Sequence, residues 1–121
     1  MLKGKIHRAT VTEADLNYMG SLTLDEDLID AAGLKEYEKI QILDITNGSR
    51  LETYIIKGER GSGQVCINGA AAHLIHAGDI VIIVSYCQLS NEEALIHQPT
   101  IVYVDSDNRI LSTSTERLSL I

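Results

Sequence analysis

Large aromatic side chains and long apolar runs are what this sequence lacks. Its 121 residues include no Phe, no Trp and one Pro, so the core must be built from Leu, Ile and Val, and the last two favour strands. The longest aliphatic run, 80–84, is far shorter than the roughly 20 residues of a transmembrane helix. The first residues, MLKGKIHRATV, contain no apolar stretch typical of a signal peptide. We therefore expect a cytoplasmic, β-rich protein.

Basic residues are also scarce. Ten Lys and Arg stand against 17 Asp and Glu, a net charge of −7, whereas nucleic-acid binders carry a basic face. Cys66 and Cys87 lie in apolar, strand-like contexts and are predicted to be buried small hydrophobes, not a disulfide. His73 and His76 have no evident third ligand. The sequence therefore predicts neither nucleic-acid binding nor a metal site.

Alternating apolar residues and turn signals predict one domain of short strands with a few short helices. Strands are predicted over 2–11, 38–45, 50–56, 64–67, 79–88 and 100–104, and helices over 25–32, 70–76 and from 90 onward. Residues 12–19 are predicted to be a turn and 105–121 a turn with a polar tail. Asn47-Gly48 is the strongest hairpin signal, and Ser90 with Glu93 fits a capping box.

One pattern occurs twice along the chain. A short helix, Ala-Gly and an Ile-rich strand follow one another at 28–43 and again at 70–84. Two such halves in a small β-rich domain suggest a pseudo-symmetric barrel.

The Gly20–Ser21 dipeptide is the candidate for unusual chemistry. A hydroxyl stands beside a carbonyl on a residue without a side chain, which permits backbone angles closed to other residues. If the fold strains that bond, Ser21 can attack the Gly20 carbonyl, turn the amide into an ester and lead to backbone cleavage. The same dipeptide occurs at 48–49 and 61–62 in turn-like contexts. The neighbours must therefore distinguish the first from the other two.

Those neighbours form a series of blocks that covers roughly residues 1–104. In chain order they are His7-Arg8, Val11-Thr12, Ala14-Asp15-Leu16, Tyr18, Gly20-Ser21, Asp30-Ala31-Ala32-Gly33, Thr46-Asn47-Gly48, Arg50, Thr53-Tyr54, Glu59-Arg60-Gly61-Ser62, Asn68-Gly69-Ala70-Ala71-Ala72-His73 and Gly78-Asp79-Ile80-Val81-Ile82. The series resembles the pyruvoyl-dependent aspartate 1-decarboxylases. The resemblance implies a mainly β fold, a double-psi β-barrel with a few short helices over 1–121, and a homotetramer with active sites at subunit interfaces.

The resemblance also implies a cofactor made from the chain itself. Cleavage between Gly20 and Ser21 would turn Ser21 into a covalent pyruvoyl group, with no metal and no pyridoxal phosphate. Its ketone would form a Schiff base with L-aspartate and accept electrons as CO2 leaves. The product, β-alanine, would feed pantothenate and coenzyme A biosynthesis. Whether a maturation partner triggers cleavage stays open.

Four side chains take roles in the family's chemistry. Thr53 would assist cleavage through a hydrogen bond to the developing oxyanion and lie against substrate. Tyr54, a phenol that carries its proton at neutral pH, would be the proton donor. Thr53 and Tyr54 face opposite sides of a regular strand, so both can reach the site only if it lies at an interface or the strand is irregular. Arg50 would hold the substrate carboxylate, with Lys5 a second candidate cation. The competing interpretation is an ordinary strand with solvated charges.

The stretch Asn68, Gly69, Ala70 and Ala71 resembles the substrate loop, whose backbone N–H groups open a helix and can meet a carboxylate. Alternatively, or in addition, Asn68 is a helix N-cap. Tyr18 and His7 are candidate pocket residues, with a structural role equally open for His7.

Three alternatives to aspartate decarboxylation remain at this point. One is a decarboxylase of another acidic amino acid. Another is an uncleaved, non-enzymatic barrel that serves as a binding or assembly module. The third, a swapped-hairpin DNA-binding barrel, conflicts with the net charge of −7.

Overall fold

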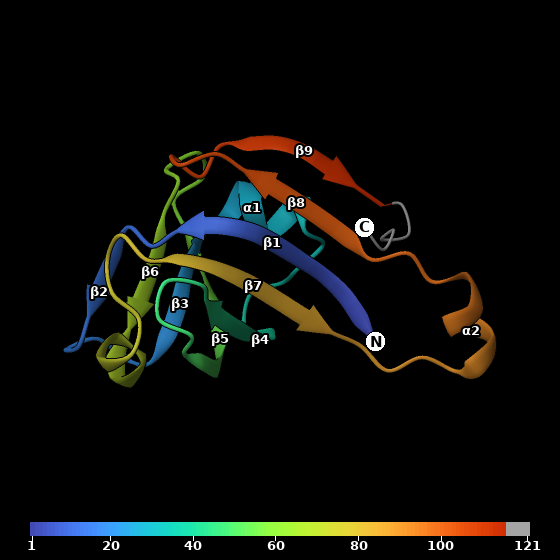
Figure 1. Cartoon of the computed structure of the whole chain (residues 1–121), viewed down its shortest axis with the longest axis horizontal. Coiled ribbons are helices and arrows are strands. Elements are labelled where there is room, and N and C mark those ends of the chain that lie inside the picture. The colour runs from blue at the N-terminus through green and yellow to red at the C-terminus, as the bar shows by residue number, and fades with distance from the viewer. Residues whose placement is uncertain (116–121) are drawn as a thin grey trace.

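Strands dominate the computed structural model, which describes residues 1–115 (Figure 1). The elements are β1 (Leu2–Thr10), β2 (Glu13–Asp15), β3 (Ser21–Asp25), α1 (Glu26–Ala31), β4 (Lys39–Asp44), β5 (Arg50–Gly58), β6 (Val65–Asn68), the 3₁₀ helix η1 (Gly69–His73), β7 (Ile80–Tyr86), α2 (Asn91–Ile96), β8 (Thr100–Val104) and β9 (Ile110–Ser114). No helix in this part of the chain is long and apolar enough to span a membrane.

The strands pair in the order β2-β6-β3-β5-β4-β7-β1-β8-β9. Parallel pairs join β1 to β8, β2 to β6 and β3 to β5, each between strands distant in sequence. The other pairs are antiparallel. This mixed, mainly β arrangement with short helices agrees with the predicted double-psi β-barrel.

The barrel core is aliphatic, as the missing Phe and Trp require. Ile6, Leu22, Ile42, Ile55 and Ile83 are fully buried and belong to one cluster. Each such side chain contributes about 1.5–3 kcal/mol through burial. The two strands of the repeated sequence pattern, β4 and β7, pair antiparallel with Ile42 opposite Ile83.

Most elements lie where the sequence predicts them. The β4–β5 hairpin turns at Asn47-Gly48, where the φ of Gly48 is +81°. Ser90 and Glu93 form the complete capping box of α2. Asp25 caps α1 through the N–H of Asp27. These signals are local, so they need no tertiary context.

Four predictions need correction. The predicted turn over 12–19 contains β2, and no strand was predicted at β3. The helix predicted over 70–76 is the single 3₁₀ turn η1. The predicted polar tail, 105–121, begins with a turn and then forms β9 against the edge of β8, while 116–121 lie outside the described residues. β2, β3 and β9 are three to five residues long and depend on pairing with β5, β6 or β8.

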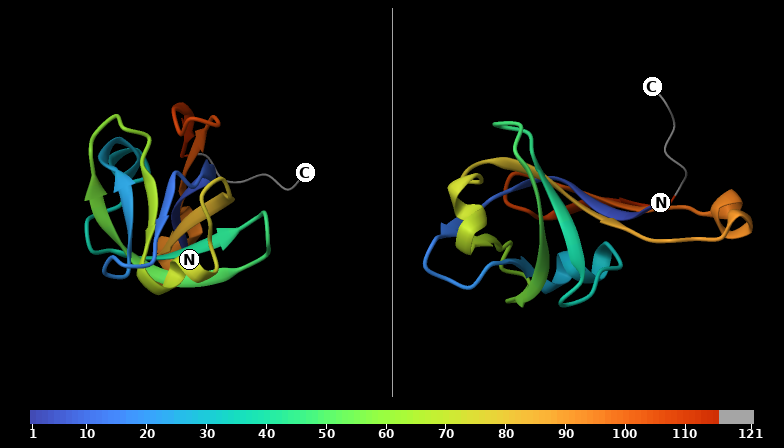
Figure 2. Two further views of the ribbon diagram at one scale, coloured as in Figure 1. Left: turned by 90° about the vertical axis from the view of Figure 1, so that its left-hand side faces the viewer. Right: turned by 90° about the horizontal axis from the view of Figure 1, so that it is seen from below.

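A long arm extends from the barrel. β7 runs out along this arm and β8 runs back, each paired with β1, and α2 lies at the tip between them (Figures 1 and 2). None of the residues of α2 is buried, and Leu95 and Ile96 are 77% and 83% exposed.

Candidate active site

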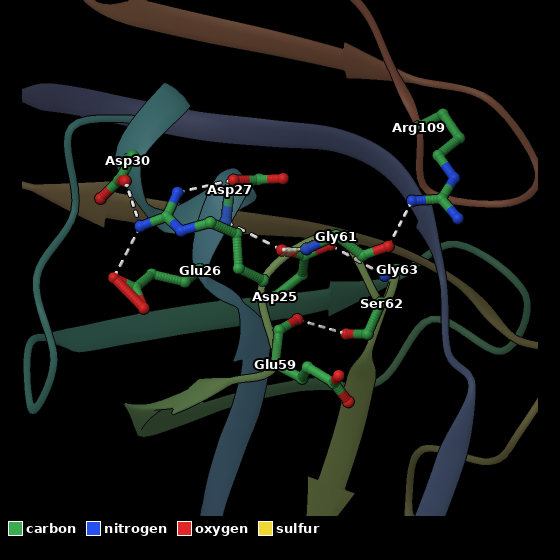
Figure 3. A network of polar contacts seen from close by, with 10 residues as sticks. Asp25, Glu26, Asp27, Asp30, Glu59, Gly61, Ser62, Gly63 and Arg109 are labelled. Atoms are coloured by element: carbon green, nitrogen blue, oxygen red, sulfur yellow. Dashed lines mark hydrogen bonds and ion pairs between the residues drawn. The ribbon is translucent and has the colours of Figure 1, made fainter.

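The three Gly-Ser dipeptides have different surroundings. Gly61–Ser62 belongs to a loop held by Asp25, whose carboxylate accepts the N–H groups of Gly61 and Gly63 at 3.0 and 2.8 Å (Figure 3). There the Ser62 hydroxyl donates to a backbone carbonyl at 2.6 Å. The 48–49 pair lies in the β4–β5 turn. Ser21 differs from both, since it begins β3 and is only 2% exposed.

Asn68 is the residue that contacts the Ser21 side chain. The two pair across β3 and β6, and Asn68 Nδ2 donates to Ser21 Oγ at 3.0 Å and to Thr23 Oγ1 at 2.9 Å. The Ser21 hydroxyl also points to the Met19 carbonyl, at 3.4 Å. Asn68 makes no side-chain bond to the start of η1. Asn68 thus stands at the N-cap position of η1, as predicted, but its side chain does not cap the helix, because the amide is directed at β3.

Gly69 is a position beside Ser21 that requires glycine. Its φ is +72°, and a Cβ there would lie 2.7 Å from Gly20 Cα and 2.8 Å from Gly20 N. Gly20 has a φ outside the left-handed region, and nothing lies within 4 Å of a Cβ added to it. Gly20 thus does not use the left-handed freedom that a glycine permits. The steric requirement falls on Gly69, to which the sequence pointed through the turn-forming Asn-Gly pair and the family block at 68–73.

An open cleft of about 440 Å³ lies beside Gly20. Its lining residues are Gly20, Leu51, Glu52, Thr53, Tyr54, Asn68, Ala70, Ala71 and Leu74. The structure thereby brings six predicted site residues to one place: Gly20, Thr53, Tyr54, Asn68, Ala70 and Ala71.

The edge of β5 explains how both Thr53 and Tyr54 reach the cleft. β5 keeps its regular alternation of exposure. Its pairing with β3 covers only residues from Ile55 onward, because β3 starts at Ser21. The edge at 51–54 therefore has β4 on one side and the cleft on the other, so consecutive residues line it.

The predicted cations do not line this cleft. Arg50 shares an exposed face of β5 with Glu52 and Tyr54, and its side chain has no ion-pair partner among the described residues. Lys5 lies on β1. Glu52, which does line the cleft, is paired with Lys39 at 2.9 Å. Within the described residues, the cleft lining of one chain therefore contains a carboxylate but no free positive charge.

His7 also lies on β1, away from the cleft lining. It is half-buried, its ring meets Tyr103 edge-on at 5.9 Å, and its Nδ1 has no hydrogen-bond partner among residues 1–115. Burial, then the charges of Lys5 and Arg8, lowers the pKa of His7, so the imidazole is neutral at pH 7.

A second hollow, of about 260 Å³, adjoins Asn68. It is lined by Glu13, Asp15, Tyr18, Thr23, Gln64, Cys66 and Asn68, and Asn68 is the residue that it shares with the cleft. The carboxylates of Glu13 and Asp15 make it unsuitable for an acidic ligand. Tyr18 is 57% exposed at this hollow.

Cys66 is a second position that sequence reasoning misjudged. It is 5% exposed, but its thiol donates to Asn68 Oδ1 at 3.2 Å. The prediction of a small buried hydrophobe therefore omitted a polar contact. Cys66 and Cys87 are both unpaired, as predicted, but Cys87 is only half-buried, so the prediction of a buried side chain is wrong for that residue.

Comparison with known proteins gives a consistent result. The family model described as aspartate decarboxylase matches residues 1–111. Among similar curated proteins, the aspartate 1-decarboxylase of Caldicellulosiruptor saccharolyticus is 60% identical, covering 96% of this chain and 91% of its own. That of Corynebacterium efficiens is 60% identical over 96% and 85%, and that of Neisseria meningitidis 63% over 91% and 87%.

Proposed function

The chain belongs to the aspartate decarboxylase family, and from that premise we propose that it removes the 1-carboxylate of L-aspartate as CO2 and releases β-alanine. The reaction makes it a carbon–carbon lyase, and the product feeds pantothenate and coenzyme A biosynthesis. One observation carries the assignment of the site. A buried serine hydroxyl, Ser21 Oγ, accepts a hydrogen bond from Asn68 at the margin of the cleft that Thr53 and Tyr54 line.

Self-cleavage begins with Ser21 Oγ. The oxygen bonds to the Gly20 carbonyl carbon, the C–N bond breaks, and the nitrogen takes the hydroxyl proton, which leaves an ester. The Cβ–Oγ bond then breaks as the Cα proton leaves to water, and both electrons stay on the oxygen, now part of the Gly20 carboxylate. A water molecule replaces the nitrogen of the resulting dehydroalanine, releases ammonia and leaves a ketone at residue 21.

The surroundings of Ser21 suit the cleavage that would form this group. The side chain that contacts Ser21 Oγ is an amide donor, Asn68 Nδ2, which can hydrogen-bond that oxygen in the ester and in the departing Gly20 carboxylate. Gly69 lies against Gly20, and Ala70 lines the same cleft as Gly20. The pyruvoyl ketone supplies the electron sink that decarboxylation of an amino acid needs.

Side chains of the chain itself would bind the substrate, stabilise the oxyanion and donate the proton. Tyr54 lines the cleft, and its hydroxyl would return a proton to the carbon that loses CO2. Thr53 lies next to it and would hydrogen-bond the oxyanion during cleavage. Arg50, on the Tyr54 face of β5, would bind the substrate's remaining carboxylate.

We further propose a cytoplasmic homotetramer with its sites between subunits. The cleft of one chain has no Lys or Arg in its lining, whereas the substrate carries two carboxylates and one ammonium group. Lys5 and His7 of a neighbouring copy would supply polar groups that this copy does not. The apolar side chains exposed on α2 would be covered in such an assembly. The unpaired Cys66 and Cys87 suit a reducing compartment.

The intact mass of the purified protein tests the proposal. We expect two chains, 1–20 and 21–121, with a carbonyl-reactive N-terminus on the larger, and release of β-alanine from L-aspartate. Ser21→Ala should remain one inactive chain. A wild-type chain that stays whole after prolonged warming, alone and with a cell extract that contains a maturation partner, would favour a non-enzymatic barrel. Faster turnover of glutamate than of aspartate would favour the other acidic substrate.

A further inference from the structure

The Asn68 side chain is held by a closed set of polar contacts. It is 3% exposed, and both of its ends are satisfied. Nδ2 donates to Ser21 Oγ at 3.0 Å and to Thr23 Oγ1 at 2.9 Å. Oδ1 accepts from Cys66 Sγ at 3.2 Å. Every hydrogen of the amide therefore has a partner, and so does its oxygen.

The two hydroxyls do not decide which way the amide points. A hydroxyl can donate or accept, so Ser21 and Thr23 could equally face Oδ1 after a half-turn of the Asn68 amide. The thiol is different, because sulfur is a weak acceptor. After the half-turn Cys66 would lose Oδ1 as its acceptor and keep only Glu13, at 3.9 Å. Cys66 is thus the contact that selects the orientation.

The thiol keeps the hydrogen that this contact needs. Burial, then the neighbouring charges of Glu13 and Asp15, raises the pKa of Cys66. A neutral thiol beside Asn68 Oδ1 is therefore the state at physiological pH.

We propose that Cys66 and Thr23 are positioning residues for self-cleavage: Cys66 selects the orientation of the Asn68 amide, and Thr23 accepts its second hydrogen and so holds the nitrogen in place beside Ser21 Oγ. This rests on the self-cleavage proposed above and adds two residues to it. When the ester breaks, Ser21 Oγ leaves with both electrons of the Cβ–Oγ bond and becomes a carboxylate oxygen. An N–H donor at that atom stabilises the charge, and hydrogen bonds to ionised oxygen are about twice as strong as neutral ones. A reversed amide would present an acceptor there instead.

Two substitutions of similar size separate hydrogen bonding from packing. Cys66→Ser keeps a donor, whereas Cys66→Val fills the space without one. If Cys66 only packs, valine should be tolerated and the buried serine hydroxyl should be harmful. If Cys66 positions Asn68, serine should cleave at close to the wild-type rate and valine about three- to tenfold more slowly. Cys87→Val, at the other free cysteine, is the matched control and should cleave like wild type.

The assay follows cell-free synthesis of each chain, with samples stopped at intervals and their intact masses measured. Hydroxylamine is added to parallel samples, because it cuts an ester and leaves an amide whole. We expect the slow Cys66→Val and Thr23→Val chains to accumulate hydroxylamine-sensitive material, which a mere folding defect would not produce. Thr23→Ser should restore the rate.

Several results would overturn the proposal. One is cleavage of Cys66→Val at the wild-type rate, and another is slower cleavage of Cys66→Ser than of Cys66→Val. If Cys66→Val lacks a cooperative unfolding transition, the Thr23→Val and Thr23→Ser pair decides, and equal rates refute a positioning role. A wild-type chain that never cleaves would refute the self-cleavage itself. A wild-type chain that cleaves, with variants that cleave at the same rate, would refute only the positioning role.

Discussion

Gly69→Ala is the substitution whose cost the structure defines best. A Cβ at this position meets two obstacles: a φ of +72° and the backbone of Gly20 at 2.7 Å. The left-handed conformation costs an L-residue about 1–2 kcal/mol. Overpacking against backbone that cannot move away costs about 1–3 kcal/mol more. We expect Gly69→Ala to destabilise the uncleaved chain by about 2–5 kcal/mol.

Gly33→Ala is the matched control. Gly33 has a φ of +71° with nothing within 4 Å of an added Cβ, so alanine there meets the first obstacle only. Both substitutions are made in the Ser21→Ala chain, which keeps Gly20 attached. Thermal unfolding followed by circular dichroism should give a midpoint about 4–12 °C lower for Gly69→Ala than for Gly33→Ala.

The same contact bears on self-cleavage. Alanine at 69 would displace Gly20 from Ser21 Oγ, and a misplacement of about 1 Å between reacting groups can cost on the order of 100-fold in rate. With Ser21 present, the intact mass of Gly69→Ala should show slow cleavage, whereas Gly33→Ala should cleave normally. Equal midpoints for the two variants, together with rapid cleavage of Gly69→Ala, would refute the reasoning.

Three further outcomes are expected. Tyr54→Phe should cleave normally but turn over aspartate about 100-fold or more slowly, and an unchanged kcat would exclude Tyr54 as the proton donor. Arg50→Met should raise the KM for aspartate about ten- to hundredfold without slowing cleavage; an unchanged KM would assign the carboxylate to another cation. Burial alone would raise the pKa of Glu38, but hydrogen bonds from Ser85 and Lys3 hold it below its usual range. The unfolding midpoint should therefore fall as pH drops through about 4.3 and below, and Glu38→Gln should show a smaller fall; equal falls would contradict it.

Local sequence signals predicted the elements whose stabilising hydrogen bonds join residues close together in the chain. Asn47-Gly48 predicted a hairpin, and Ser90 with Glu93 predicted a capped helix, since the relevant hydrogen bonds join residues three or four apart. β2 and β3 escaped prediction for the opposite reason. Their stability comes from pairing with β5 and β6, which follow them in the chain by about 30 to 50 residues.

For the candidate site, too, one part was predicted from the sequence and another part is visible only in the fold. The family blocks identified Gly20, Ser21 and the Thr53-Tyr54 pair without any knowledge of the fold. They did not reveal that Thr53 and Tyr54 line one cleft, which depends on where β3 stops covering β5.

Taken alone, the sequence determined the kind of chain this is: an aliphatic β-rich domain with the ordered motifs of the aspartate decarboxylases, Gly20–Ser21 among them. Those features are read along the chain, so no contact is needed to find them. The tertiary structure alone decided which side chains meet the reactive hydroxyl. The Asn68 side chain is directed at Ser21 and not at the start of η1, and the Cys66 thiol contacts the amide oxygen as well as filling space. Such choices depend on which donors and acceptors the fold buries together, because a buried polar group must find a partner wherever the chain supplies one.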